Sequence, residues 1–135
     1  TALPVKVNKV KTRKRYFNYL LILKNDSILL HKRGLGDIWA NMYELPLIET
    51  DGPAEVSDVL NLHKNKLLGT PSVKVRSVSG VYKHVLTHQH LYVRFIELDR
   101  TENGLTGDYF FTEVKNLKNL ALPQIIFLFL TNFLN

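Results

Sequence analysis

The sequence predicts an α+β domain in which two helices pack on a mixed β-sheet. Segments rich in β-forming residues occur in two groups, and each group is followed by a segment with helical character. The chain has 135 residues, of which 45% are hydrophobic, and this suffices for one domain with a substantial core. We therefore expect a single compact unit with the element order β-β-β, helix, β-β-β, helix.

The strands of the first half are expected on both sides of a tight turn. Segments 16–24 and 27–32 are rich in β-formers, and Asn25-Asp26 separates them as a hairpin turn would. Residues 42–48 form a further short apolar element. Residues 1–4 are expected to be the end of an interdomain linker, and residues 5–135 are expected to form the domain. Because the sequence does not begin with Met, we expect it to start inside a longer protein.

The strands of the second half are expected at 73–83 and 91–98, with a polar, histidine-rich connection between them. Within 91–98, side chains alternate between two faces, with Leu91, Val93 and Phe95 on one of them. A last short strand is expected at 108–111, and residues 112–120 are expected to form a turn.

The chain ends in a very apolar segment, QIIFLFLTNFL, at residues 124–134. Pro123 suits the first turn of a helix. A membrane-spanning helix needs roughly 20 such residues, so we expect a helix that is buried on both sides, and no membrane association.

The net charge of +6 is concentrated near the N-terminus. Six of the 18 Lys and Arg residues precede residue 16, and no Asp or Glu does. Such a stripe suits a polyanion, and it equally suits a solvated edge strand whose lysines discourage aggregation. The candidate contacts to a DNA backbone are Lys9, Lys11, Arg13, Lys14 and Arg15. No signal peptide is visible, so secretion is not expected.

The helix expected at 55–68 decides against one enzymatic activity. Its sequence is EVSDVLNLHKNKLL, and its only acids, Glu55 and Asp58, lie in the first turn, where they suit the helix dipole. The element order, with this helix after a glycine-rich loop, resembles the Nudix hydrolases, whose Arg-Glu-x-x-Glu-Glu cluster holds Mg²⁺ against a diphosphate. That cluster is missing, so we expect no hydrolase activity. A divergent Nudix hydrolase remains the enzymatic alternative.

The segment KHVLTHQHL at 83–91 concentrates His84, His88 and His90. The histidines have neither a thiol nor a carboxylate nearby in sequence, and the chain has no cysteine, so no metal site is expected. A plain polar entrance to a strand is the alternative to a functional role.

Two sequence blocks, HVLTHQHL at 84–91 and IW followed by MYELP within 38–46, carry a family resemblance. They resemble the H-x-F-S-H-x-H-L and G-I-W-x-x-L-Y-E-F-P stretches in the C-terminal domain of the MutY family of A/G-mismatch adenine DNA glycosylases. The N-terminal LPVKVNKVKTRKRYFNYLLI and the hairpin sequence SILLHKR also match. The resemblance covers nearly the whole chain, with Leu86 standing for the motif's Phe and Thr87 for its Ser.

This resemblance implies a catalytically inactive, Nudix-like domain that binds duplex DNA and recognises 8-oxoguanine opposite adenine. The lesion-reading loop would be Leu86, Thr87, His88 and Gln89. Adenine removal would belong to a catalytic domain absent from this chain, which would also hold an iron-sulfur cluster, so no cofactor is expected here. The implied location is the bacterial cytoplasm, at the nucleoid, and a sliding clamp is a further expected partner. A module that docks to repair partners without reading the lesion is the remaining alternative.

The turn is expected to recognise 8-oxoguanine through a hydrogen bond. Guanine has an acceptor at N7 and a hydrogen at C8, whereas 8-oxoguanine has an N7–H donor and an O8 acceptor. The Thr87 hydroxyl has one donor and two acceptor lone pairs and suits this edge, with His88 orienting the loop or meeting a phosphate. Such a contact should discriminate by about 1–3 kcal/mol.

The remaining notable residues are expected to be structural. Trp39, Tyr43 and Pro46 are expected to pack in the core. The loop with Arg33, Gly34 and Gly36 is either a connector or an approach to DNA. His31 and His63 are assigned no chemistry.

Overall fold

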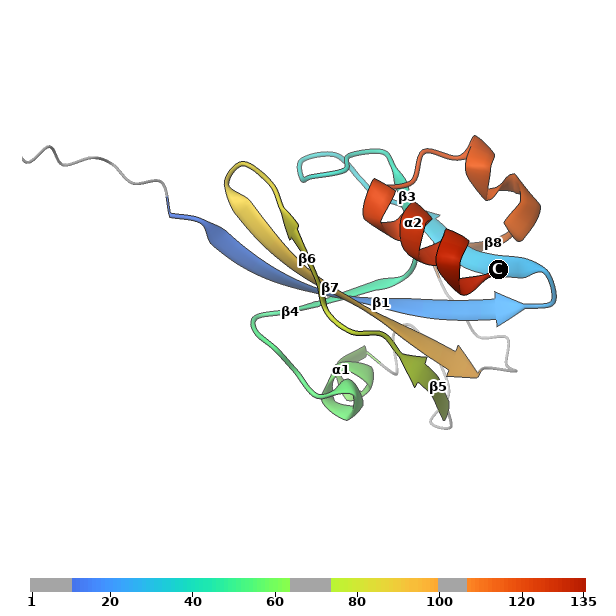
Figure 1. Cartoon of the computed structure of the whole chain (residues 1–135), viewed down its shortest axis with the longest axis horizontal. Helices are drawn as coiled ribbons and strands as arrows, with labels where there is room; N and C mark the ends of the chain where they lie inside the picture. The colour runs from blue at the N-terminus through green and yellow to red at the C-terminus, as the bar shows by residue number, and fades with distance from the viewer. Residues whose placement is uncertain (1–10, 64–73, 100–106) are drawn as a thin grey trace, which may run out of the picture.

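The computed structural model describes residues 11–63, 74–99 and 107–135, and this part of the chain is an α+β domain (Figure 1). It contains eight strands, two α-helices and one 3₁₀ helix. In chain order they are β1 (Arg13–Lys24), β2 (Ser27–Lys32), β3 (Tyr43–Glu44), β4 (Leu47–Thr50), α1 (Val56–His63), β5 (Lys74–Val78), β6 (Tyr82–Val85), β7 (Gln89–Asp99), β8 (Phe110–Glu113), η2 (Val114–Asn119) and α2 (Gln124–Phe133). The predicted class is confirmed, with η2 in the segment expected to be a turn.

The two longest strands, β1 and β7, lie side by side in the middle of the sheet and run parallel (Figure 1). β1 also pairs antiparallel with β2 and with β4, and β7 pairs antiparallel with β5 and β6. The sheet is therefore mixed, as expected. The predicted hairpin is confirmed, and Asn25 in its turn has a φ of 55°, a left-handed conformation that Asn adopts more readily than most residues.

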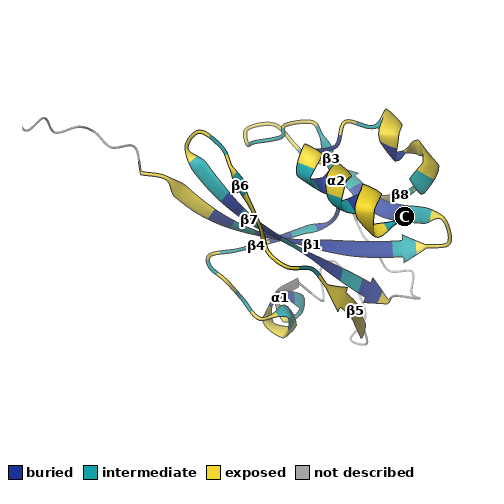
Figure 2. Cartoon of the chain, viewed as in Figure 1, coloured by how far each residue is buried: buried dark blue, intermediate teal, exposed yellow. Residues whose placement is uncertain are grey.

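Alternation along β1 supplies two separate cores. Phe17, Tyr19 and Leu21 face one side, where they pack with residues of η2 and α2. Leu20 and Ile22 face the other side, where they pack with α1. Helices thus cover both faces of the sheet, and burying both faces explains why residues 17–22 are apolar apart from Asn18 (Figure 2).

The strand expected at 73–83 is divided in two. Val78 pairs with Ile96 and Tyr82 pairs with Val93, so three residues of this chain segment lie opposite two residues of β7. The extra residue creates an irregularity of the β-bulge type, which bends the strand between β5 and β6. The Ser79 hydroxyl accepts a hydrogen bond from the Phe95 backbone N–H at 2.9 Å and stabilises this bend.

The helix α2 begins directly after Pro123, as expected, but the prediction that it is buried on both sides is wrong. Ile126 and Leu130 are buried in the core, whereas Phe127 and Leu128 remain 38% and 51% exposed. The helix forms the outer layer of the described structure and has the sheet on one side only (Figure 2). Among the described helices, none is long and apolar enough to cross a membrane.

Candidate nucleic-acid interface

The segment predicted to read the lesion is the turn between β6 and β7. The Leu86 backbone N–H donates to the Gln89 carbonyl at 2.8 Å and closes the turn. Thr87 and His88 are exposed at its tip, whereas Leu86 is half-buried and packs against the core. The residue that replaces the motif's Phe therefore anchors the turn, and the two polar residues face solvent.

The parallel pairing of β1 with β7 brings the basic stretch beside this turn. Arg13 pairs with Gln89, and the Arg13 backbone N–H donates to the His88 carbonyl at 3.0 Å. Lys11, Arg13 and Lys14 are exposed. The exposed start of β1 thus lies beside the β6–β7 turn (Figure 2). We call these residues, Lys11, Arg13 and Lys14 with the turn at 86–89, the basic edge. Lys9 lies outside the described residues.

Arg15 differs from the other cationic candidates, because its side chain is only 5% exposed. Its Nη1 and Nη2 donate to Asp37 at 2.7 and 2.9 Å, and its Nε and Nη2 both donate to Glu49 at 2.8 Å. These hydrogen bonds raise the pKa of Arg15 still further, Glu49 contributing most. The guanidinium is held by internal carboxylates, so we leave it out of the proposed contacts to DNA phosphates.

A signal for this internal role is present in the sequence. Arg15 stands two positions before Phe17 and four before Tyr19, which face one core. Period-2 alternation therefore directs Arg15 inward. Its guanidinium carbon lies 4.9 Å from the centre of the Phe17 ring. The inward position of Arg15 is missed when Arg15 is grouped by charge with the basic residues before it.

A second ion network holds the loop at residues 33–42. Arg33 donates to both carboxylate oxygens of Glu44, at 3.0 and 3.1 Å, and to Asp37 at 2.9 Å. Glu44 is 1% exposed and also accepts a hydrogen bond of 2.7 Å from the Tyr19 hydroxyl. Burial, together with Glu44, raises the pKa of Tyr19 well above its usual value. Asp37 is shared by Arg33 and Arg15 and so links this loop to β1.

The residues expected to pack in the core do so. Pro46 is buried, and Trp39 and Tyr43 are half-buried against the main core. The Trp39 ring centre lies 6.0 Å from that of His84, so the loop at 33–42 contacts the hairpin that carries the turn. His31 Nε2 lies 3.0 Å from a Glu44 oxygen without hydrogen-bond alignment, and the side chain of His63 lies outside the described part.

The histidines of the hairpin do not form a metal site in the described structure. His84 and His90 are half-buried and His88 is exposed. In residues 11–63, 74–99 and 107–135, no group of three or more His, Asp or Glu side chains is placed to hold a metal ion.

A family model described as "NUDIX domain" matches residues 18–132. The chain belongs to the Nudix domain family. No curated protein matches this Nudix domain.

Several solved structures share the fold of this Nudix domain. The MutT protein of Methanosarcina mazei Go1 has a TM-score of 0.67 and 13% identity, over 88% of this chain and 91% of that one. The MutT Nudix hydrolase of Burkholderia pseudomallei has a TM-score of 0.65 and 15% identity, over 86% and 95%. The C-terminal domain of mouse MUTYH, solved in complex with human PCNA, has a TM-score of 0.59 and 15% identity, over 84% and 83%.

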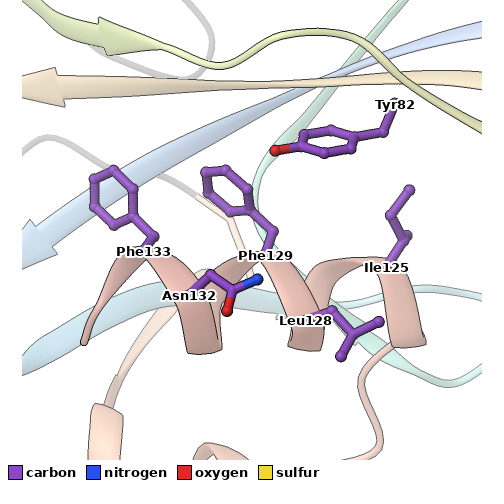
Figure 3. A pocket seen from close by; sticks show the side chains of 6 residues that line it. All are labelled: Tyr82, Ile125, Leu128, Phe129, Asn132 and Phe133. Carbon is purple, nitrogen blue, oxygen red and sulfur yellow. The ribbon is translucent and has the colours of Figure 1, made fainter.

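Two hollows of this Nudix domain are lined by residues other than those of the basic edge. One, of about 360 Å³, is apolar, and Figure 3 shows the Tyr82 ring facing Phe129 of α2 across it. The other, of about 160 Å³, lies beside the stacked rings of Tyr16 and Tyr92. Neither is lined by Asp or Glu, so neither offers carboxylates for a metal ion.

The stability of the Nudix domain is expected to fall at acidic pH because of Asp37. Hydrogen bonds from Arg15 lower the pKa of Asp37 from 3.8 to about 2. A carboxylate with a lowered pKa stabilises the fold above its unfolded pKa, and this contribution disappears as pH falls through the folded pKa. Asp37 is 37% exposed, so solvent screening reduces the contribution to about 1 kcal/mol.

The measurement compares the free energy of unfolding of wild type and Asp37→Asn, obtained by urea unfolding at pH 6, 4, 3 and 2. The stability difference between wild type and variant should be constant above about pH 4 and shrink towards about pH 2. A difference independent of pH across this range would contradict the assignment. Asp51→Asn, which alters an exposed carboxylate outside the network, is the control.

Proposed function

We propose that this Nudix domain is the C-terminal domain of an A/G-mismatch adenine DNA glycosylase of the MutY family, which binds duplex DNA and recognises 8-oxoguanine opposite adenine. The observation that carries the proposal is the basic edge. Lysine and arginine side chains suit DNA phosphates, and an adjacent exposed turn with a hydroxyl and an imidazole suits a base edge. The turn also carries one of the sequence blocks that resemble the MutY family.

Adenine excision, in this proposal, belongs to a catalytic domain of the same polypeptide. That domain would hold the iron-sulfur cluster, since this chain has no cysteine and requires no cofactor for reading DNA. The setting is the bacterial cytoplasm, at the nucleoid. The similarity to the C-terminal domain of mouse MUTYH, which was solved with PCNA, supports a sliding clamp as a further partner.

The second candidate is a Nudix hydrolase of a nucleoside diphosphate derivative. It is favoured by family membership and by the fold shared with a MutT Nudix hydrolase. The sequence of residues 55–68 argues against a hydrolase, because Glu55 and Asp58 are its only acidic residues and the cluster that would hold Mg²⁺ is missing. Pyrophosphate or phosphate release from nucleoside diphosphate derivatives, with and without Mg²⁺, separates the two functions. Magnesium-dependent turnover would establish the hydrolase, and lesion-selective DNA binding without turnover would establish the reader.

Replacing Thr87 with Ala is expected to reduce the preference for the lesion about fivefold. A lost hydrogen bond of this kind costs about 1 kcal/mol or more, and a freely rotating hydroxyl belongs at the lower end of that range. The measurement is the affinity of the chain for two duplexes that differ only in 8-oxoguanine or guanine opposite adenine. The rate of adenine excision by the whole glycosylase on the same duplexes gives a second readout.

Thr112→Ala, a substitution of the same kind in β8, is the control and should leave both affinities unchanged. An unaltered preference in Thr87→Ala would remove Thr87 from the reading contact. Equal affinity of the wild-type chain for both duplexes would favour the docking-module alternative.

Removing the charges of Lys11, Arg13 and Lys14 together is expected to weaken binding to lesion and normal duplexes alike. Each phosphate contact contributes about 0.9 to the slope of log K against log salt, so the slope should become shallower by about 2 to 3. The slope is measured by DNA titrations at salt concentrations between about 50 and 200 mM, where phosphate contacts change the affinity strongly.

The matched control removes three exposed charges at the far ends of the strands: Lys24, Lys74 and Arg76. They are expected to lie about 30 Å from the turn, since a strand rises about 3.3 Å per residue. Equal changes of slope in both triple variants would show that the basic edge is not the DNA-binding surface.

A further inference from the structure

The side-chain amide of Gln89 has a fixed orientation at the base of the turn. Arg15 Nη1 donates to Gln89 Oε1 at 3.1 Å. A guanidinium has donors only, so it can hold the oxygen of the amide and never its nitrogen. The Nε2 group, with two N–H donors, is therefore turned away from Arg15.

Arg15 cannot release this amide easily, because its other four N–H groups are all engaged. They donate to Asp37 and Glu49, which come from the loop at 33–42 and from β4. The two carboxylates fix the guanidinium plane from two sides, and the side chain is 5% exposed. A flip of the Gln89 amide would put its N–H groups against those of Arg15.

The backbone fixes the position of Gln89 as its side-chain contact fixes the orientation. Its carbonyl accepts the hydrogen bond that closes the turn, and Gln89 pairs with Arg13 at the start of the parallel β1–β7 ladder. Thr87 and His88, the exposed residues of the turn, precede it directly. A base edge that contacts Thr87 would therefore lie two residues from a side chain whose unbound Nε2 group can only donate.

A fixed donor does what a hydroxyl cannot do alone. The Thr87 hydroxyl can accept from the N7–H of 8-oxoguanine, and after rotation it can donate to N7 of guanine. An amide N–H can only donate, and at the C8 side guanine offers a hydrogen where 8-oxoguanine offers an oxygen. A donor aimed there is satisfied by the lesion and left unsatisfied by guanine.

Building on the proposed function, we propose that Gln89 determines the specificity of the turn by donating from Nε2 to the O8 oxygen of the lesion, with Arg15 as the positioning residue that fixes its amide. Thr87 and Gln89 together match the N7–H and O8 pattern of 8-oxoguanine, one by accepting and the other by donating. The selectivity of the pair comes mainly from the group that cannot rotate.

The decisive variant is Gln89→Glu. Glutamate has the same shape and keeps an oxygen for Arg15, but it removes both N–H donors at the pH of the assay. The 135-residue chain is titrated with duplexes containing 8-oxoguanine or guanine opposite adenine, and the ratio of the two affinities is compared with that of wild type. We expect the ratio to fall about tenfold or more, while the Tm stays within a few degrees of wild type.

Val85→Glu controls for the added charge, because Val85 is 60% exposed on the same hairpin and its side chain has no polar group. This variant should weaken binding to both duplexes equally and leave the ratio unchanged. Arg15→Lys tests the positioning, because one ammonium cannot replace the guanidinium fork. In folded protein it should lower the ratio without adding negative charge to the turn.

A wild-type ratio in Gln89→Glu, together with a reduced ratio in Thr87→Ala, would overturn the inference and leave the proposed function intact. A wild-type ratio in folded Arg15→Lys would overturn the positioning role of Arg15. If the wild-type chain itself does not distinguish the two duplexes, the proposed function fails, and this inference fails with it.

Discussion

Replacing Arg15 with Ala is expected to lower the free energy of unfolding by about 3 kcal/mol. Removing one partner of a buried ion pair leaves the other charge without compensation, which costs about 3–5 kcal/mol. Here two carboxylates are left close together, although Asp37 and Glu49 are 37% and 34% exposed and water can partly replace the guanidinium. The expected loss therefore lies at the lower end of that range. Urea unfolding with an unchanged m-value would measure it.

Arg76→Ala is the matched control, because Arg76 is exposed in β5 and its loss should cost about 0.5 kcal/mol or less. A double-mutant cycle of Arg15→Ala with Asp37→Asn should give a coupling of about 1 kcal/mol or more. A loss below about 1 kcal/mol in Arg15→Ala would mean that the network contributes orientation and little stability.

Replacing Phe95 with Ala is expected to cost about 4 kcal/mol, the largest stability effect we expect from a single substitution in the core. Phe95 is 1% exposed, and its ring stacks on Phe129 with a centroid distance of 3.8 Å and an interplanar angle of 3°. Its ring also contacts those of Tyr19 and Tyr82, at 5.7 and 6.0 Å between centroids. Truncation of a buried Phe typically costs about 3–5 kcal/mol, since the surroundings cannot close the cavity.

The control is Phe111→Ala, because Phe111 is 39% exposed and should cost about 1 kcal/mol. Thermal and urea unfolding of both variants give the comparison. A loss in Phe95→Ala no larger than that in Phe111→Ala would show that α2 does not pack on β7 as described. The lesion preference of the folded Phe95→Ala protein should be unchanged, because the residue lies six positions along β7 from Gln89.

Local patterns in the sequence were sufficient for most of the elements. The hairpin around Asn25, the alternation of Leu91, Val93 and Phe95, and the start of α2 after Pro123 all follow from backbone preferences and periodicity within a few residues. The bulge that divides β5 from β6 depends on how many residues of β7 lie opposite, and no local pattern carries that number.

The candidate interface was predicted in its parts but not in its assembly. The turn at 86–89 and the basic stretch were recognised separately from a motif and from charge. Their contact depends on β1 pairing with β7 in a parallel register, which joins residues far apart in the chain. The internal role of Arg15 is of the same kind, because its partners Asp37 and Glu49 come from segments 22 and 34 positions away.

The parallel β1–β7 pair also constrains how the domain folds. The β6–β7 hairpin is local and can form within microseconds, on the order of 1–10 μs for hairpins of this kind. Arg15 and Gln89 are 74 positions apart, and strand pairing over such a separation is slow because a long stretch of chain must be closed first. We therefore expect the turn to form before its basic neighbour is in place, and the complete surface to appear only when β1 pairs with β7. A truncated chain that begins after β1 would retain the motif but lack both the cationic strand and the group that orients Gln89.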